Sequence, residues 1–368
     1  MLFTYQPVPH NMEKMQEFID FIFHKVWCKA PTAEYGMHLF EPNEALHTIM
    51  DELYRRDLAD SLQDGAGKWF YCSVNEIYIE FGKLDTKAIN EYHRYFQDNN
   101  TIEALCAGDT DHRPVRYFDL SPEMSTLNER LKAFYKNLYS SGFWVLAFVK
   151  EAIGTDLASY YNDFVRTNNQ GVCPFCGIQP IDNELDPTRE AFDHYLPKSK
   201  YPFNSVNLKN LCPICSKCNT GNKADKDPLH DQQQNRRRAF YPFSTASPDI
   251  DVSITLLDKN WEQPTSDKLD LSLHSGTSQD MVETWDDLFS VHQRYLARCC
   301  STQGAEYWIN QVLRESENYE KSAQEVLQAQ ISWSEDSPWI EANFLKAALL
   351  KGCERAGLFT DQPNNVAD

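Results

Sequence analysis

The chain has 368 residues and a net charge of −19, with 42% hydrophobic and 24% charged residues, a composition that is ordinary for a soluble globular protein. Phosphate binding needs lysine and arginine, so this charge argues against a chain that grips nucleic acid over its whole surface. No stretch approaches a membrane span. The first residues lack the basic start and apolar core of a signal peptide, so we expect a cytoplasmic protein. In that compartment, paired cysteines among the eleven present bind metal more often than they form disulfides.

Residues 1–168 form the first predicted region, and their pattern is mainly helical. Apolar side chains recur at helical spacing, and Asn43 and the Ser121-Pro122 pair stand where helix starts are expected. Residues 77–81 alternate like a strand. The many aromatic residues are interpreted as core packing, because these helices lack the interleaved basic residues of a nucleic-acid stacking surface. The expected helical segments are residues 12–26, 43–62, 86–97, 121–153 and 156–167.

The region after residue 240 changes character. Two segments within residues 249–274 alternate between apolar and polar side chains and predict a β-hairpin. Helices are expected to resume near residue 279 and to continue to about residue 357, with a break around residues 334–338. The predicted boundaries are 241–360 for this region and 361–368 for a disordered tail. The overall expectation is an α+β protein that is mainly helical.

Two Cys-x-x-Cys pairs mark the central region, residues 169–240. Cys173/Cys176 and Cys215/Cys218 can each form a knuckle whose thiolates converge on one tetrahedral zinc. The 38 residues between the pairs exceed the spacing of a simple zinc ribbon, so a further functional element is expected between them. Cys212 with Cys215 is also a permitted pair, but the second knuckle is preferred because Asn219 then follows it directly. Cys212 is interpreted as a buried thiol at the end of a strand.

The central region also carries a local excess of basic residues. Between residues 193 and 238 there are nine Lys/Arg against four Asp/Glu, a net charge of +5, so the rest of the chain carries −24. This suits a protein whose affinity for nucleic acid is borrowed from a partner, although an acidic surface that keeps the protein soluble is an equally consistent interpretation. Arg236-Arg237-Arg238 is interpreted either as a phosphate contact or as a solvated charge run.

Between the knuckles lie Asp193-His194 and Asn207, and Asn219 and Lys223 follow the second knuckle. An Asp, a His and an Asn can hold a hard metal ion and activate a water. In this order and spacing the residues resemble the HNH (ββα-metal) endonucleases, over residues 171 to about 228. The resemblance implies a β-hairpin followed by a helix that holds one divalent ion.

Each matching residue takes a role from that resemblance. His194 would be the general base that deprotonates the attacking water. Asp193 and Asn219 would bind Mg²⁺ or Mn²⁺, while the four knuckle cysteines hold structural Zn²⁺. Asn207 would brace the loop and orient the imidazole, and Lys223 would contact phosphate, one residue later than the commonest spacing. His230 is an alternative ligand that falls past the expected helix.

The segment from Asp193 to Pro202, with the Cys-Pro-Phe-Cys upstream, further resembles HNH proteins of bacterial antiphage systems such as Septu and some retrons. That resemblance implies a DNA endonuclease controlled by an ABC/AAA-type ATPase partner, for which residues 1–168 could be the docking platform. An RNA or tRNA nuclease with the same site, and a noncatalytic zinc-binding adaptor, are the two alternatives.

Overall fold

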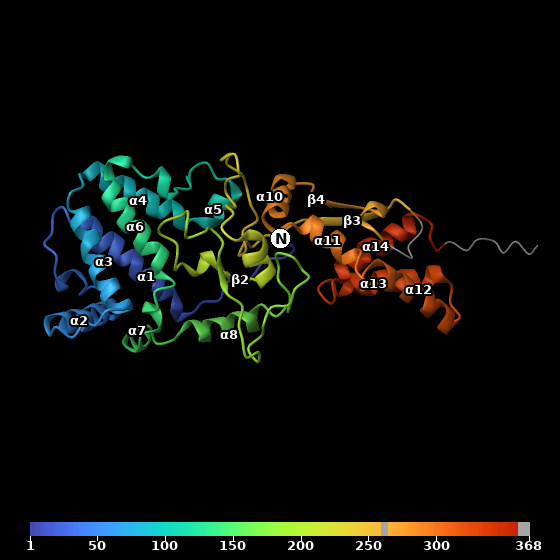
Figure 1. Cartoon of the computed structure of the whole chain (residues 1–368), viewed down its shortest axis with the longest axis horizontal. Helices are drawn as coiled ribbons and strands as arrows, with labels where there is room; N and C mark the ends of the chain where they lie inside the picture. The colour runs from blue at the N-terminus through green and yellow to red at the C-terminus, as the bar shows by residue number, and fades with distance from the viewer. Residues whose placement is uncertain (259–263, 360–368) are drawn as a thin grey trace, which may run out of the picture.

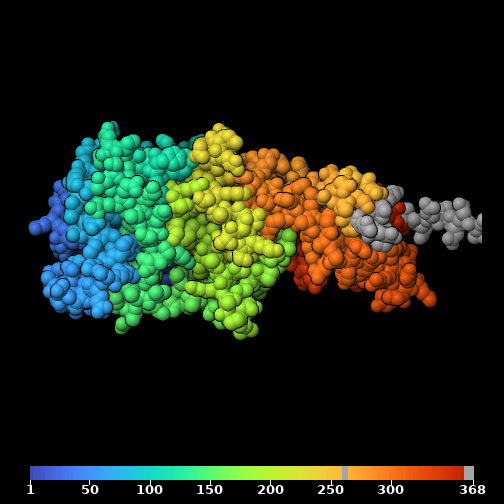
Figure 2. All heavy atoms as spheres, in the orientation of Figure 1, coloured from blue at the N-terminus to red at the C-terminus, as the bar shows by residue number. Residues whose placement is uncertain are grey.

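A computed structural model describes residues 1–258 and 264–359, and the chain forms an elongated, mainly helical α+β structure (Figures 1 and 2). The N-terminal helices occupy one end, the central region lies in the middle, and the C-terminal hairpin and helices occupy the other end. The described residues contain two small antiparallel sheets, β1-β2 and β3-β4. None of their helices is long and apolar enough to cross a membrane.

The N-terminal region confirms most of the predicted helices. Asn43 caps α2, where its side chain accepts a hydrogen bond from the Leu46 amide at 3.1 Å. Asp156 caps α8 in the same way, which satisfies amides that have no partner inside the helix. The helices are α1 (Lys14–Phe21), α2 (Glu44–Leu58), α3 (Ala66–Phe81), α4 (Thr86–Asn100), α5 (Ile102–Ala107), α6 (Ser125–Leu138), α7 (Ala147–Ile153) and α8 (Leu157–Thr167).

Two predictions in this region are wrong. Residues 77–81 are the end of helix α3, whose buried side chains recur at helical rather than strand spacing. The stretch from 121 to 153 is interrupted after α6. Gly142 there adopts a left-handed backbone (φ 82°), which glycine tolerates and other residues rarely do. A short 3₁₀ turn, Phe143–Val145, then leads into α7.

Aromatic side chains fill the core of the N-terminal region, as predicted. The rings of Phe70 and Phe143 stack with centroids 3.9 Å apart, and those of Phe23 and Phe96 with centroids 4.3 Å apart. Phe203, from the central region, contacts both Phe23 and Phe96. The aromatic core therefore continues beneath the loop that carries the predicted hydrolytic residues.

The central region contains a short hairpin followed by a helical turn. β1 (Phe192–His194) pairs antiparallel with β2 (Leu211–Pro213), so that Asp193 faces Cys212 and His194 faces Leu211. α9 (Ser216–Cys218) and the π-helical turn η9 (Asn219–Lys223) follow directly. The two strands are thus followed by a short helical segment, and the expected HNH module stays a prediction.

The C-terminal region confirms the hairpin, the resumed helices and the break after α13. Gly352 of α14 is required by close packing, because a Cβ there would lie 2.2 Å from the Ile254 carbonyl oxygen of β3. Residues 361–368, predicted to be disordered, lie outside the described residues. The elements are β3 (Asp251–Leu256), β4 (Leu269–His274), α10 (Gln279–Phe289), α11 (Val291–Cys299), α12 (Ala305–Tyr319), α13 (Ala323–Asp336) and α14 (Asn343–Arg355).

Candidate metal centre and hydrolytic site

The two knuckles bring Cys173, Cys176, Cys215 and Cys218 into one buried cluster. Their sulfur atoms all lie within 4.8 Å of one another, and those of Cys176 and Cys215 are 4.0 Å apart. Tetrahedral zinc with Zn–S bonds of about 2.3 Å places its sulfurs about 3.8 Å apart, so the cluster fits structural zinc. Cys212 lies in β2 outside the cluster, where it is a fully buried thiol as predicted.

Backbone hydrogen bonds shape both knuckles. In the first, the amides of Cys176 and Gly177 donate to the Cys173 carbonyl at 3.2 and 2.7 Å. In the second, the amides of Cys218 and Asn219 donate to the Cys215 carbonyl at 3.0 and 2.9 Å. These tight turns hold each pair of thiols on one side of its loop, which is the arrangement that a single metal ion requires.

Helices of the C-terminal region clamp the cysteine cluster. The guanidinium of Arg294 donates to Cys218 Sγ at 3.2 Å and to the Phe289 carbonyl at 3.2 Å. The hydroxyl of Tyr295 donates to the Cys176 carbonyl at 3.0 Å, and the indole of Trp285 donates to the Phe175 carbonyl at 2.9 Å. Arg294 thus places a positive charge beside a site that becomes anionic when four thiolates bind Zn²⁺. Sequence analysis assigned these three residues no role at the metal.

Asp193 and Lys223 form a buried ion pair at the hairpin. Lys223 is fully buried and Asp193 is 5% exposed, and the ammonium lies 2.8 Å from Asp193 Oδ2. The same ammonium donates a hydrogen bond to the His194 carbonyl at 3.0 Å. Asp193 Oδ2 accepts no well-directed hydrogen bond from the described residues, so the contact with Lys223 is an ion pair. Lys223, predicted to contact phosphate, is thus engaged inside the protein and bridges η9 to β1.

His194 is partly buried and is held by the loop that follows β1. Its Nε2 lies 2.8 Å from the Ser205 carbonyl oxygen, and its ring contacts the edge of Tyr139 with centroids 4.9 Å apart. Burial, and to a lesser extent the charges of Lys198 and Lys223, lower the pKa of His194 to about 3. The imidazole is therefore neutral at physiological pH. Because a carbonyl only accepts, Nε2 carries the proton and Nδ1 keeps its lone pair.

The two predicted asparagines have different environments. Asn207 accepts from the Lys209 amide at 2.9 Å and donates to Asn100 Oδ1 at 2.9 Å, which ties its loop to α4. The hydrogen bond that orients the imidazole comes from the Ser205 carbonyl, two residues earlier in the same loop. Asn219 starts η9, and its side chain makes no hydrogen bond to any residue that the structure describes.

Buried asparagines that sequence analysis missed hold the same loop together. Asn210 accepts from the Leu196 amide at 2.8 Å and donates to the Leu196 carbonyl at 3.0 Å, closing the segment between the strands. Asn204 donates to the Asn99 carbonyl at 2.9 Å. The recurrence of asparagine at 204, 207 and 210 was the available signal, because asparagine side chains bond readily to nearby backbone.

The two predicted ligands of a hard cation, Asp193 and Asn219, have suitable oxygen atoms, but no contact joins them among the described residues and Asp193 is paired with Lys223. Asp193 supplies a carboxylate and Asn219 an amide oxygen, the ligand types that Mg²⁺ prefers. Among the described residues, the four cysteines are the only cluster of three or more Cys, His, Asp or Glu side chains with metal-ligand spacing. A cation at the hairpin would therefore rely on water and substrate for most of its coordination.

The Arg236–Arg238 run is used for internal contacts. Arg237 pairs with Asp287 at 2.7 Å and Arg238 with Asp280 at 2.6 Å, which fastens this segment to α10. Arg236 donates to backbone carbonyls, that of Leu229 among them at 3.2 Å. Arg236 is exposed and the side chain of Arg238 is 42% exposed, so the run is partly solvated, and the phosphate contact stays a prediction.

Comparisons with known proteins are sparse. No protein-family model matches the chain, and no solved structure matches it. Protein ea31 of Escherichia phage lambda is 38% identical over 85 residues, which are 23% of this chain and 25% of that protein. The chain thus spans about a quarter of the length of the relative it matches, a likeness too short to place the whole chain in a family.

Proposed function

We propose that the protein is an HNH endonuclease that hydrolyses phosphodiester bonds in DNA with the help of Mg²⁺ or Mn²⁺. The observation that carries the proposal is the surroundings of His194. The imidazole leaves one strand of a hairpin, the Ser205 carbonyl holds its Nε2, and Lys223 returns from the following helical turn to Asp193 and the His194 carbonyl. The cysteine cluster flanks the same hairpin and turn.

His194 would act as the general base. Its Nδ1 carries the lone pair and receives no hydrogen bond from the described residues, so it is available to accept the proton of the attacking water. The nearby negative charge of a bound phosphodiester raises the pKa of an imidazole, which makes the nitrogen more basic when substrate is present.

Asp193 and Asn219 would hold the divalent cation, which when bound stabilises charge on the phosphoryl and leaving 3′ oxygens. Lys223 is a positioning residue in this account. It neutralises part of the Asp193 charge and fixes the carbonyl of His194, and with it the strand that presents the imidazole.

The resemblance to HNH proteins of antiphage systems extends the proposal to the biological role. There the nuclease is encoded beside an ABC- or AAA-type ATPase, and we take such an ATPase as the partner that controls cleavage. The partner explains how a chain with a net charge of −19 could reach nucleic acid, because the partner would supply much of the affinity.

The test is a cleavage assay with the full chain. Wild type, His194→Ala and the exposed control His274→Ala are incubated with supercoiled plasmid and with bulk RNA, in Mg²⁺ or Mn²⁺, with and without EDTA. The proposal expects plasmid cleavage by wild type and the control, lost in His194→Ala and on chelation, with equal zinc content in all three proteins.

Other outcomes separate the alternatives. If the protein cleaved RNA and left the plasmid intact, the proposed substrate of the same site would be RNA and not DNA. A function in cells that survives His194→Ala but not Cys173→Ser would indicate a zinc adaptor without catalysis.

A further inference from the structure

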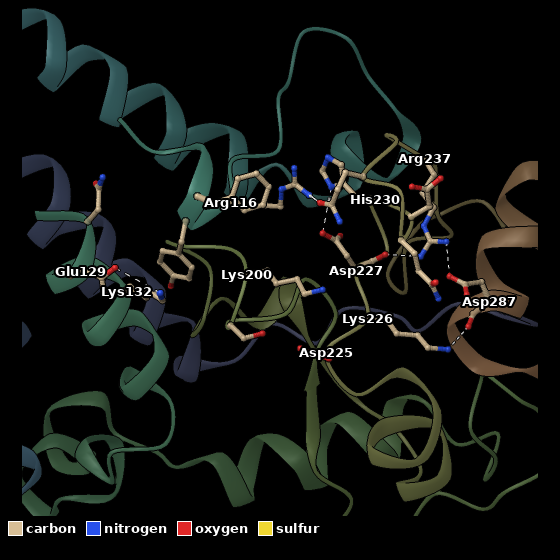
Figure 3. A pocket seen from close by; sticks show the side chains of 17 residues that line it. Arg116, Glu129, Lys132, Lys200, Asp225, Lys226, Asp227, His230, Arg237 and Asp287 are labelled. Carbon is tan, nitrogen blue, oxygen red and sulfur yellow. Dashed lines mark hydrogen bonds and ion pairs between the residues drawn. The ribbon is translucent and has the colours of Figure 1, made fainter. Parts of the chain in front are cut away.

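A cavity of about 580 Å³ opens between the N-terminal helices and the segment after Lys223 (Figure 3). Its walls come from the loop around Arg116, from α6, and from two segments of the central region. One segment includes Lys200, six residues after His194, and the other includes Asp225, two residues after Lys223. The cavity is therefore built from the same stretches of chain that carry the predicted catalytic groups.

Most charged groups in this cavity are already paired. Arg237 bonds to Asp287 at 2.7 Å, and Asp227 accepts from the Tyr201 hydroxyl at 2.7 Å. Asp225 and Lys200 differ, because neither side chain makes an ion pair or hydrogen bond with the residues that the structure describes, and of the two only Lys200 is a cation. Figure 3 shows that the Lys200 side chain projects into the cavity. An unpaired ammonium directed into a cavity is a site for an anionic group such as phosphate.

The aromatic ring of Phe118 lines the same cavity. Phe118 is 68% exposed, and the guanidinium of Arg116 lies over its ring, 4.0 Å from the centroid. Arg116 is fixed there by Asp119 at 3.2 Å and by Gln234 at 2.7 Å. Nucleobases stack on aromatic rings and on guanidinium planes, so this pair offers a stacking platform with little loss of side-chain freedom.

We propose that this cavity binds a nucleoside phosphate, with the base stacked on the Arg116–Phe118 pair and the phosphate held by Lys200. Its volume falls in the range of small-molecule sites, about 300–1,000 Å³. The ligand is either a free nucleotide or an unpaired nucleotide of the strand being cut. The second source rests on the proposed endonuclease function, because it requires the protein to act on a nucleic-acid strand.

Binding is measured on full-length protein carrying His194→Ala, so that no probe is consumed. The probes are a fluorescent single-stranded DNA oligonucleotide, followed by polarisation, and unlabelled ATP and GTP, followed by calorimetry. Phe118→Ala and Lys200→Gln are each added to this background. Tyr319→Ala and Lys87→Gln, an exposed aromatic residue and an exposed lysine outside the cavity, are the matched controls.

The proposal expects each cavity variant to weaken binding about 5-fold or more, because one variant removes the stacking ring and the other removes the charged hydrogen bond. The controls should bind as the parent does. Binding of the oligonucleotide alone identifies a strand subsite, and binding of ATP or GTP alone identifies a free nucleotide. If both cavity variants bound the probes as tightly as the parent protein does, or if no probe bound at all, the proposal would be overturned.

The cleavage assay keeps the two proposals apart. Cavity-dependent binding with no cleavage by wild type would refute the endonuclease and leave the nucleotide site standing. Cleavage by wild type that is unaffected by either cavity variant, with no cavity-dependent binding, would refute only the nucleotide site.

Discussion

The cysteine cluster and the surroundings of His194 lie in the same segment, residues 173–223, yet they are assembled in different ways. Two tight backbone turns present the four cysteines, and each turn is complete within a few residues. The imidazole of His194 depends on the Ser205 carbonyl, and its loop depends in turn on Asn100 of α4. A cysteine cluster can therefore be recognised from spacing, whereas the imidazole of His194 is positioned by contacts from distant elements.

The largest expected effect separates the cysteines by role. Cys215→Ala should lose zinc and unfold the central region, because zinc binding contributes about 10–16 kcal/mol in small structural sites. Cys212→Ala should keep one full equivalent, because Cys212 lies in β2 outside the cluster. Zinc content by mass spectrometry and thermal melting are the measurements. Zinc loss in Cys212→Ala with retention in Cys215→Ala would reverse the assignment.

The next effect concerns the buried ion pair on the hydrolytic side. Lys223→Met should cost about 3–5 kcal/mol in urea unfolding, because it leaves the Asp193 carboxylate buried without a counter-charge. Adding Asp193→Asn should recover much of that loss. If Lys223→Met left stability unchanged while weakening nucleic-acid binding, the lysine would be a surface phosphate contact as the sequence suggested.

A smaller effect is expected from the residue that joins the C-terminal region to the zinc cluster. Arg294→Met removes the N–H···S bond to Cys218 and should weaken zinc affinity about 10- to 100-fold, the usual range for groups that support metal ligands. Competition with a chromophoric chelator measures it, with exposed Arg314→Met as the control. Equal zinc affinity in both variants would show that α11 does not support the metal.

The smallest effect tests the helical region beneath the hydrolytic loop. Burial, then the charges of His93 and Lys25, lower the pKa of His24 from 6.5 to about 4. His24 therefore binds a proton more tightly in the unfolded chain than in the folded protein. The free energy of unfolding should fall as the pH drops from about 6.5 to 4, and below pH 4 the contribution of His24 should stay constant. We expect about 1 kcal/mol after solvent screening. Urea unfolding of wild type and His24→Gln across this range should converge at low pH, and parallel curves would contradict the prediction.

The elements of the fold differ in how far the sequence predicts them. Caps such as Asn43, the hairpin at β3-β4 and the cysteine cluster follow from local side-chain chemistry, and all three are confirmed. Residues 77–81 were assigned as a strand because five residues alternate like one. Only over the full length of α3 does the helical spacing of Val74, Ile77 and Phe81 become visible.

The rest of the candidate site could not be predicted from spacing. The carbonyl of Ser205 carries no side-chain signal, and the burial of Lys223 follows from the fold of η9 against β1. Arg294 reaches the cluster from 76 residues away. Contacts of this kind depend on tertiary packing, which no motif in the chain encodes.

The most direct test of the central claim is the rate of plasmid nicking by His194→Ala relative to wild type, at equal zinc content and equal melting temperature. The account predicts a fall of about 100- to 10,000-fold, the usual contribution of a general base. Nicking at the wild-type rate by a folded, zinc-loaded His194→Ala protein would contradict it.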